Sequence, residues 1–320
     1  MTFVSKKTIK GGGRYYLEKS IRLTDGKVRK ISVYLKDYKT GSRAKGMYKF
    51  EQLLNTKVRN ALIEHAAGFY KKSNIFTKET ILRLEEQKLD YKKLIKKISK
   101  KQFQDIIDRF AVNFTYESNA IEGNSLTLKD VAIVLQEKKA LKDKDLREVY
   151  ETLNTREALE HIFGNKLKVS EKNIIKLHRI LVKDTGIGTG YKKLPNFLLG
   201  RTIKTTPPEN VKEEMDALIS WYHESKDIHP LQKAAVFHGK FEKIHPFEDG
   251  NGRVGRLLIN IMLTSHGYPP LIIRKTHRLS YLSCLEAFDR RYEDKLQRFL
   301  IEKYKNTYEK FFKVYVKYLK

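Results

Sequence analysis

Cysteine is almost absent from this sequence of 320 residues, in which Cys284 is the only one. A single cysteine excludes a disulfide within the chain and a zinc site built from several cysteine ligands. Long apolar runs are also absent, both at the N-terminus, where a signal peptide needs one, and later, where a membrane helix needs about 18 such residues. We therefore expect a soluble, cytoplasmic protein with no membrane partner.

Acidic residues are few relative to basic ones. The chain contains 65 Lys and Arg against 38 Asp and Glu, which gives a formal net charge of +27. Such an excess suggests a polyanionic partner, of which nucleic acid is the largest kind. With 40% hydrophobic residues the chain can bury a sizeable core in one large domain or two ordinary ones, so complete disorder is excluded.

Two kinds of hydrophobic periodicity divide the chain. Near the N-terminus, alternation predicts two strands, and the Asp25-Gly26 pair between them is typical of a tight hairpin turn. The alternating residues are Leu17, Ile21 and Leu23, followed by Ile31, Val33 and Leu35. From about residue 45 the spacing is that of amphipathic helices, with N-terminal caps predicted at Thr127 and Ser170. The expected fold class is mainly α with a small N-terminal β-hairpin element.

The segment 185–208 interrupts the helical pattern. Its glycines and prolines surround two short pieces with β propensity, 196–199 and 201–205, which predicts a flap-like hairpin. The glycines of 186–190 match neither the P-loop pattern nor the dinucleotide fingerprint, and no βαβ pattern surrounds them. We do not interpret that run as a nucleotide site.

Residues 245–256, HPFEDGNGRVGR, lead into a strongly apolar helix. Gly250 and Gly252 allow the backbone to curl so that successive N–H groups converge, and the positive end of the helix dipole adds to them. Arg253 and Arg256 are three residues apart, so both guanidinium groups can reach one bound anion. This arrangement predicts a binding site for a polyphosphate.

Two further residues of this run supply chemistry. Asp249 offers a hard carboxylate beside the phosphates, which is the kind of ligand that Mg²⁺ prefers. His245 can serve as a general base, because its unperturbed pKa is near neutrality. A glycine-rich cap on an ordinary buried helix is the alternative, but such a cap needs neither the two arginines nor His-Pro-Phe ahead of it.

The run HPFEDGNGRVGR resembles the catalytic motif of the Fic family, HPFx[D/E]GNGRxxR, at every specified position. The resemblance implies a protein adenylyltransferase in which His245 deprotonates a hydroxyl of a target protein. That oxygen attacks the α-phosphate of ATP, which leaves AMP on the target and releases pyrophosphate.

The resemblance also implies roles for individual residues. Asp249 would hold Mg²⁺ against the phosphates, Arg256 would clamp the γ-phosphate, and a buried Phe247 would fix the loop. Tyr281 would lie near the adenine pocket, although an aromatic residue on an amphipathic helix is usually a core residue. The remaining phosphate ligands would be Gly250, Asn251, Gly252 and Arg253.

A second element resembles the inhibitory pattern [S/T]xxxE[G/N] of self-restrained Fic proteins. It runs from Ser118 to Gly123, and the resemblance implies that Glu122 pairs with Arg256 and blocks productive placement of the γ-phosphate. A solvated glutamate or a structural ion pair is the alternative interpretation. Some relatives use the same glutamate to remove AMP, so removal of AMP and transfer of another nucleotide stay open as alternatives.

The resemblance implies an all-α Fic core with a β-hairpin flap. A target protein would dock along 190–208, where Lys192 departs from the Arg common among relatives; self-modification and a homo-oligomer stay open. The expected divisions are an N-terminal hairpin element (1–45), a helical region (46–109), the Fic core (110–300) and a C-terminal helix (301–320). The rival from another class is a basic nucleic-acid-binding protein. We expect a nucleotide instead, because the arginines with specific geometry suit a small polyanion.

Overall fold

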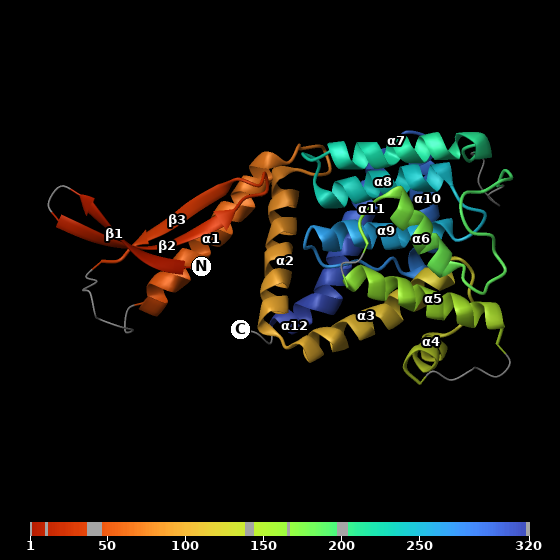
Figure 1. The fold of residues 1–320 in the computed structure, drawn as a ribbon, viewed down its shortest axis with the longest axis horizontal. Coiled ribbons are helices and arrows are strands. Elements are labelled where there is room, and N and C mark those ends of the chain that lie inside the picture. Colours follow the sequence, from red (N-terminus) through yellow and green to blue (C-terminus); the bar gives the residue numbers. More distant parts are fainter. Residues whose placement is uncertain are drawn as a thin grey trace. The chain divides into compact units, whose positions relative to one another are not determined.

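A computed structural model describes residues 2–9, 12–36, 47–137, 144–164, 167–196 and 204–317. The protein is mainly helical with a small antiparallel sheet near the N-terminus, so the predicted fold class is confirmed (Figure 1). The chain divides into two compact units, Met1–Leu89 and Asp90–Lys320, and the division lies within helix α2 (Lys78–Lys97). Within the described ranges, no helix combines the length and the apolar character needed to cross a membrane.

The first unit contains a three-stranded sheet. Its strands β1 (Thr2–Ile9), β2 (Gly12–Arg22) and β3 (Val28–Tyr34) are antiparallel and lie in the order β1-β2-β3. The turn between β2 and β3 is closed by a hydrogen bond from Leu23 N–H to the Lys27 carbonyl at 2.8 Å, and Gly26 has a φ of +86°. The predicted hairpin is therefore confirmed, but the sequence pattern does not predict β1.

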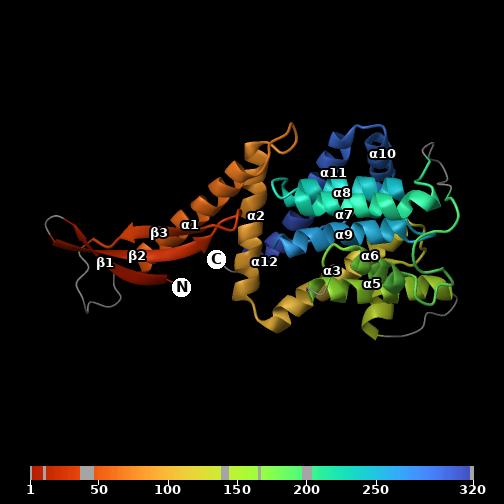
Figure 2. The ribbon, with the colours of Figure 1, turned by 45° about the horizontal axis from the view of Figure 1, so that its top comes forward.

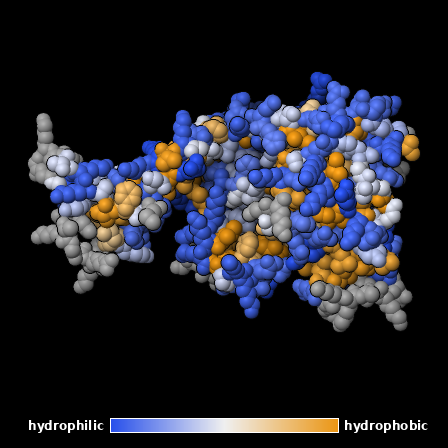
Figure 3. Space-filling model, viewed as in Figure 1, coloured by the Kyte–Doolittle hydropathy of each residue, from blue (hydrophilic) through white to orange (hydrophobic). Residues whose placement is uncertain are grey.

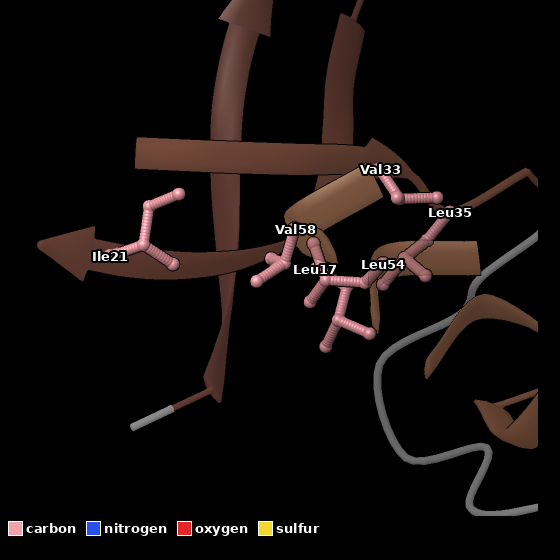
Figure 4. Close-up of a cluster of buried hydrophobic side chains, with 6 residues drawn as sticks. All are labelled: Leu17, Ile21, Val33, Leu35, Leu54 and Val58. Carbon is pink, nitrogen blue, oxygen red and sulfur yellow. The ribbon is translucent and has the colours of Figure 1, made fainter. Parts of the chain in front are cut away.

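Helix α1 (Met47–Phe69) packs on one face of this sheet. The core between them is formed by alternate strand residues and two residues of the helix, as Figure 4 shows. These residues are Leu17, Ile21, Val33, Leu35, Leu54 and Val58. Because side chains alternate across a strand, the residues between them lie on the opposite face of the sheet.

The second unit is a bundle of helices. Its helices are α3 (Lys100–Ile121), α4 (Leu128–Ala132), α5 (Leu146–Phe163), α6 (Glu171–Leu181), α7 (Val211–Glu224), α8 (Pro230–Ile244), α9 (Asn251–Ser265), α10 (Arg278–Asp289), α11 (Glu293–Thr307) and α12 (Lys313–Lys317). Helix α9 contacts α3, α5, α6 and α8, and it lies inside the bundle in both ribbon views (Figures 1 and 2). A helix that is apolar on all sides requires such a central position.

Local signals begin several of these helices where the sequence predicts. The Thr127 hydroxyl accepts a hydrogen bond from Asp130 N–H at 3.2 Å, and the Ser170 hydroxyl accepts one from Asn173 N–H at 3.3 Å. Both caps satisfy donors of the first helical turn. Hydrophilic residues cover most of the face that Figure 3 shows, with hydrophobic residues in several separate patches, as the strongly charged composition leads one to expect.

The predicted flap is only partly described. Residues 197–203, which include most of both β-prone pieces, lie outside the described residues. The described flanks, 190–196 and 204–208, contain no strand. They instead contact the loop between α8 and α9, as set out below.

Candidate active site

The loop between α8 and α9 is defined by two left-handed residues. His245 ends α8 with a φ of +51°, and Gly250 precedes α9 with a φ of +81°. A positive φ is unusual for a residue with a side chain, so the backbone at His245 is held there by its surroundings. The two residues reverse the chain so that α9 packs against α8.

The interior of this loop is held by an amide and a stacked ring pair. Asn251 Oδ1 accepts from Phe247 N–H at 2.9 Å, and Asn251 Nδ2 donates to the Phe247 carbonyl at 2.8 Å. The fully buried Phe247 ring stacks on His178 of α6 with centroids 3.8 Å apart. His178 Nε2 lies 3.0 Å from the Asp249 carbonyl oxygen, and burial lowers the pKa of His178 to about 4. Phe247 is therefore buried as predicted.

The flanks of the flap clamp the other side of the loop. Lys192 N–H donates to the Pro246 carbonyl at 2.9 Å, and its Nζ donates to the Thr205 hydroxyl at 3.0 Å. Asn196 Nδ2 donates to the Phe247 carbonyl at 2.9 Å. Burial lowers the pKa of Lys192 to about 8. Lys192, in the first flank of the flap, therefore contacts both the second flank, through Thr205, and the loop, through Pro246.

A pocket of about 530 Å³ opens beside the loop. Of the residues predicted for the site, it brings together His245, Gly252, Arg256, Tyr281 and Glu122. The other lining residues come from the ends of α3 and α8 and from α10; they are Ile121, Glu242, Arg278, Leu279, Leu282, Ser283, Leu285 and Glu286. The pocket therefore joins three helices to the beginning of α9.

The pocket has the features of an anion site. Among the described residues no side chain makes a capping hydrogen bond at the N-terminus of α9, so the first N–H groups of that helix keep their positive potential. Arg256 Nη1 is buried and makes no hydrogen bond to any residue that the structure describes. A buried guanidinium nitrogen without an acceptor is costly, and an anion in the pocket would satisfy it.

Glu122 places its own carboxylate at this anion site. It follows the last residue of α3, and its Oε1 lies 2.7 Å from Arg256 Nη2. A Cβ atom built on Gly252 would lie 2.1 Å from the same Oε1, so the carboxylate rests directly on the first turn of α9. Ser118 completes the arrangement, because its hydroxyl and its carbonyl accept from Arg256 Nε at 3.0 Å and from Nη2 at 2.9 Å.

His245 lies in the pocket with its side chain 14% exposed. Its Nδ1 is 3.4 Å from the Glu242 carbonyl oxygen and 3.9 Å from Glu242 Oε2. Glu242 is buried one turn earlier on α8, and it also lies 3.9 Å from Nε2 of the buried His238. Glu242 is therefore an acidic neighbour of His245, the predicted general base, on the side of Nδ1.

Tyr281 on α10 lines the pocket and is also a core residue. Only 1% of it is exposed, and its hydroxyl lies 2.7 Å from His238 Nε2. The Arg256 guanidinium lies 6.0 Å from the centre of its ring. Burial raises the pKa of the Tyr281 hydroxyl, which therefore stays neutral. Its predicted contact with adenine remains a prediction.

Asp249 and Arg253 form a separate ionic network beside the pocket. Asp249 Oδ2 lies 2.7 Å from Arg147 Nη2 and 3.5 Å from Arg253 Nη2. Arg253 Nη1 also lies 3.0 Å from Glu151 Oε1. Neither Asp249 nor Arg253 lines the pocket, and the same holds for Gly250, Asn251 and Ser118. Across the described ranges no three His, Cys, Asp or Glu side chains cluster as metal ligands would.

Several residues of this site could not be predicted from the sequence. Arg147 and Glu151 lie on α5, about 100 residues before the loop, and His178 lies on α6. Arg278, at the start of α10, donates from Nε to the Ile121 carbonyl at 2.7 Å and so connects α10 to the end of α3. Only Glu242 could have been found from its position in the sequence, because it lies three residues before His245, near the end of the helix that His245 caps.

Known structures share this fold. A Fic domain-containing signalling protein from Bacteroides thetaiotaomicron superposes with a TM-score of 0.65 at 27% identity, over 73% of this chain and 95% of that one. Caenorhabditis elegans Fic-1 superposes with a TM-score of 0.62 at 21% identity, over 83% of this chain and 84% of that one, which supports the fold. The profile of the Fic/DOC family matches residues 168–263, from just before α6 to within α9. Residues 168–263 are therefore similar to Fic/DOC family domains.

Curated relatives extend the match beyond the Fic domain. The protein adenylyltransferase Fic of Nematostella vectensis is 36% identical over 178 residues, which are 53% of this chain and 41% of that protein. The protein adenylyltransferase fic-1 of C. elegans is 30% identical over 182 residues, which are 54% of this chain and 36% of that protein. The chain therefore matches about two fifths of the length of these relatives.

Proposed function

We propose that this protein is an adenylyltransferase that transfers AMP from Mg-ATP to a hydroxyl group of a target protein. The observation that carries the proposal is a single pocket in which His245 faces an anion site made by the start of α9 and the buried Arg256. The relatives named protein adenylyltransferase match about half of this chain and support the same activity.

The proposed reaction is an in-line displacement at the α-phosphate. The hydroxyl oxygen of the target forms a bond to the α-phosphorus, the bond from that phosphorus to the bridging oxygen breaks, and pyrophosphate leaves. His245 accepts the hydroxyl proton. The N–H groups at the start of α9, with the side chains of Arg253 and Arg256, are proposed to stabilise the charge that develops on the phosphate oxygens.

Asp249 is the proposed ligand of Mg²⁺. A single carboxylate fits this ion when it is bound with a nucleotide, because phosphates and waters fill the other positions. The Asp249 side chain is 41% exposed and lies next to the N-terminus of α9. To hold the ion, its carboxylate would have to leave its present contact with Arg147. When bound, Mg²⁺ neutralises part of the charge on the phosphates.

The contact between Glu122 and Arg256 is proposed to restrain the enzyme. A carboxylate and a phosphate need the same surroundings: a guanidinium group and helix N–H donors. Since Glu122 Oε1 lies on Gly252 and 2.7 Å from Arg256, a nucleotide phosphate must displace it to reach these donors. A signal that withdraws Glu122 would therefore activate the enzyme.

The target segment is proposed to bind along 190–208. The flanks of this segment contact the Pro246 carbonyl through Lys192 and the Phe247 carbonyl through Asn196. A hydroxyl side chain of a segment held there would be carried toward the loop that contains His245. Main-chain hydrogen bonds, the usual means of holding an extended segment, would make this binding tolerant of the target sequence.

Incubation with ATP labelled at the α-phosphate tests the proposal. We expect Glu122→Gly to label itself or proteins of a cell extract more strongly than the wild type does, and His245→Ala to give no label. Asp105→Asn, a change of an exposed acidic residue on α3, is the matched control and should resemble the wild type. Equal labelling by the wild type, Glu122→Gly and His245→Ala would refute the catalytic assignment.

Removal of AMP by the same site is the second candidate. Its support is that the 41%-exposed carboxylate of Glu122 and the imidazole of His245 line one pocket, where the carboxylate can orient a water molecule. Labelled protein isolated from the first experiment, incubated without ATP, should lose label faster with added wild-type enzyme than with Glu122→Gln. Equal loss with both would exclude this candidate.

A further inference from the structure

The face of the N-terminal sheet that lies opposite α1 combines aromatic and basic side chains. In the observed register, Phe3 pairs with Glu18, Lys7 pairs with Arg14, and Tyr16 pairs with Tyr34. Residues directly opposite each other in antiparallel strands lie on the same face. We call this the open sheet face; its residues are Phe3, Ser5, Lys7, Arg14, Tyr16, Glu18, Ser20, Arg22, Val28, Lys30, Ser32 and Tyr34.

Aromatic rings of all three strands lie on this face. Phe3 is 42% exposed and Tyr34 is 46% exposed. The rings of Tyr16 and Tyr34 have centroids 5.5 Å apart at an angle of 51°. Exposed rings on neighbouring strands of an open sheet form a platform on which unstacked nucleic-acid bases can stack.

A basic side chain accompanies each ring. Lys7 Nζ lies 4.7 Å from the centre of the Tyr16 ring, and Lys30 Nζ lies 5.7 Å from that of Phe3. The Arg14 guanidinium lies 5.9 Å from the centre of the Tyr34 ring. Each cation lies over one face of its ring, within reach of the phosphates of a strand whose bases stack on these rings.

The one acidic residue of the strands fixes two of these cations. Glu18 is buried, with Oε1 2.9 Å from Lys7 Nζ and Oε2 3.4 Å from Lys30 Nζ. The hydrogen bond from Lys7 is the main reason why the pKa of Glu18 is lowered, so the carboxylate stays ionised. The two lysines are thereby held in place while their side chains stay about half exposed.

The charge of this part of the chain complements a polyanion. The strands contain seven Lys and Arg and one acidic residue. Residues 1–89 contain 21 Lys and Arg against 8 Asp and Glu, so they carry +13 of the total formal charge of +27. Nearly half of the excess charge therefore lies in little more than a quarter of the chain.

We propose that the open sheet face binds single-stranded RNA, with bases stacked on Tyr16, Tyr34 and Phe3 and phosphates on Lys7, Arg14 and Lys30. An acidic protein surface or a nucleic-acid duplex would use the cations but would not stack on the rings. The hydroxyl groups of Ser20 and Ser32 lie on the same face and can bond to the ribose 2′-OH, which distinguishes RNA from DNA. This inference does not depend on the proposed transfer of AMP.

Fluorescence anisotropy with the full chain and a labelled single-stranded RNA of about 12 nucleotides tests the role of the rings. We expect Tyr34→Ala to lower the affinity by about fivefold or more, and Tyr34→Phe, which keeps the ring, to bind like the wild type. Tyr48→Ala is the control, because Tyr48 is an exposed tyrosine on α1, away from the open sheet face, with 70% of it exposed against 46% of Tyr34. Loss in Tyr34→Phe or in Tyr48→Ala equal to that in Tyr34→Ala would overturn the stacking role.

Salt dependence and competition test the phosphate contacts and the choice of RNA. Lys30→Glu should weaken binding severalfold and reduce the slope of log K against log salt by about 0.7, whereas Lys57→Glu, the same change at an exposed site on α1, should have little effect. Unlabelled single-stranded RNA should compete better than DNA of the same sequence, duplex RNA or poly-glutamate. An equal or better competition by any of these three would overturn the proposal, as would equal effects of the two lysine variants.

Discussion

Substitution of Glu122 should tighten nucleotide binding, because the carboxylate occupies the position that a phosphate needs. Glu122 is 41% exposed and its partner Arg256 is 2% exposed, so the ion pair is intermediate between a surface pair and a fully buried one. Surface pairs contribute about 0–1 kcal/mol and removal of one partner from a buried pair costs about 3–5 kcal/mol. With a discount for the exposed side we assign about 1–2 kcal/mol, which corresponds to about a 5- to 30-fold lower Kd for ATP.

Calorimetric titration of ATP with Mg²⁺ measures this effect without turnover when every protein also carries His245→Ala. The Kd should fall in the order parent, Glu122→Gln, Glu122→Gly, because glutamine keeps the volume but loses the charge. Asp105→Asn on the same helix controls for the general loss of one negative charge. The difference should persist at about 0.5 M salt, where long-range effects of exposed charges are screened but direct competition for one position is not.

The same substitution should affect the unliganded protein in the opposite direction. Without Glu122, the Arg256 guanidinium keeps the hydroxyl and the carbonyl of Ser118 as acceptors but loses its ion pair with the Glu122 carboxylate. We therefore expect a Tm lower by about 2–6 °C and a larger rise in Tm on addition of ATP than in the parent. An unchanged Kd in both Glu122 variants together with the lower Tm would refute the reasoning and leave only a structural ion pair.

Three other predictions concern single contacts. Ser118→Ala removes the acceptor of Arg256 Nε, and we expect a higher KM for ATP with kcat changed less, measured by initial rates. Gly252→Ala places a Cβ 2.1 Å from the present position of Glu122 Oε1, so unfolding by urea should show lower stability in the wild-type background and a smaller loss in a Glu122→Gly background. The pKa of His178 falls from 6.5 to about 4 on folding, so stability should be full above pH 6.5 and decline by about 3 kcal/mol toward pH 4. Urea titrations across this range should show a flatter decline for His178→Gln, and an equal decline would contradict this assignment.

Part of the N-terminal sheet is predictable because its signals are local. The hairpin β2–β3 follows from alternation on both sides of Asp25-Gly26, since the turn and both strands lie within one short segment. Strand β1 has adjacent lysines, Lys6 and Lys7, and only a weak alternation, so nothing in its own residues indicates a strand. Its formation depends on pairing with β2, where Lys7 meets the carboxylate of Glu18.

The residues of the candidate site also differ in how far the sequence alone predicts them. The loop 245–256 is recognisable because glycines, arginines and a histidine at fixed spacing are needed in one stretch, and the structure places His245, Gly252 and Arg256 around one pocket. Arg147 is not recognisable, because an exposed arginine on a helix resembles every other solvated cation until folding brings α5 to Asp249. Glu122 is intermediate, since its short pattern suggests a partner but only the fold shows the contact.

The proposed restraint and the proposed phosphate binding both use the guanidinium group of Arg256. Arg256 holds the carboxylate of Glu122 through Nη2, while its Nη1 is left for a ligand of the pocket. A substitution such as Arg256→Lys would therefore release Glu122 and remove the fork of donors that a phosphate needs, so the rate alone would not separate the two effects. Nucleotide affinity separates them: loss of Glu122 raises it and loss of the guanidinium lowers it. If Glu122 restrains the enzyme as proposed, a change that moves Glu122 at the end of α3 would relieve the inhibition and keep the donors of Arg256, whereas a change at Arg256 itself would remove both.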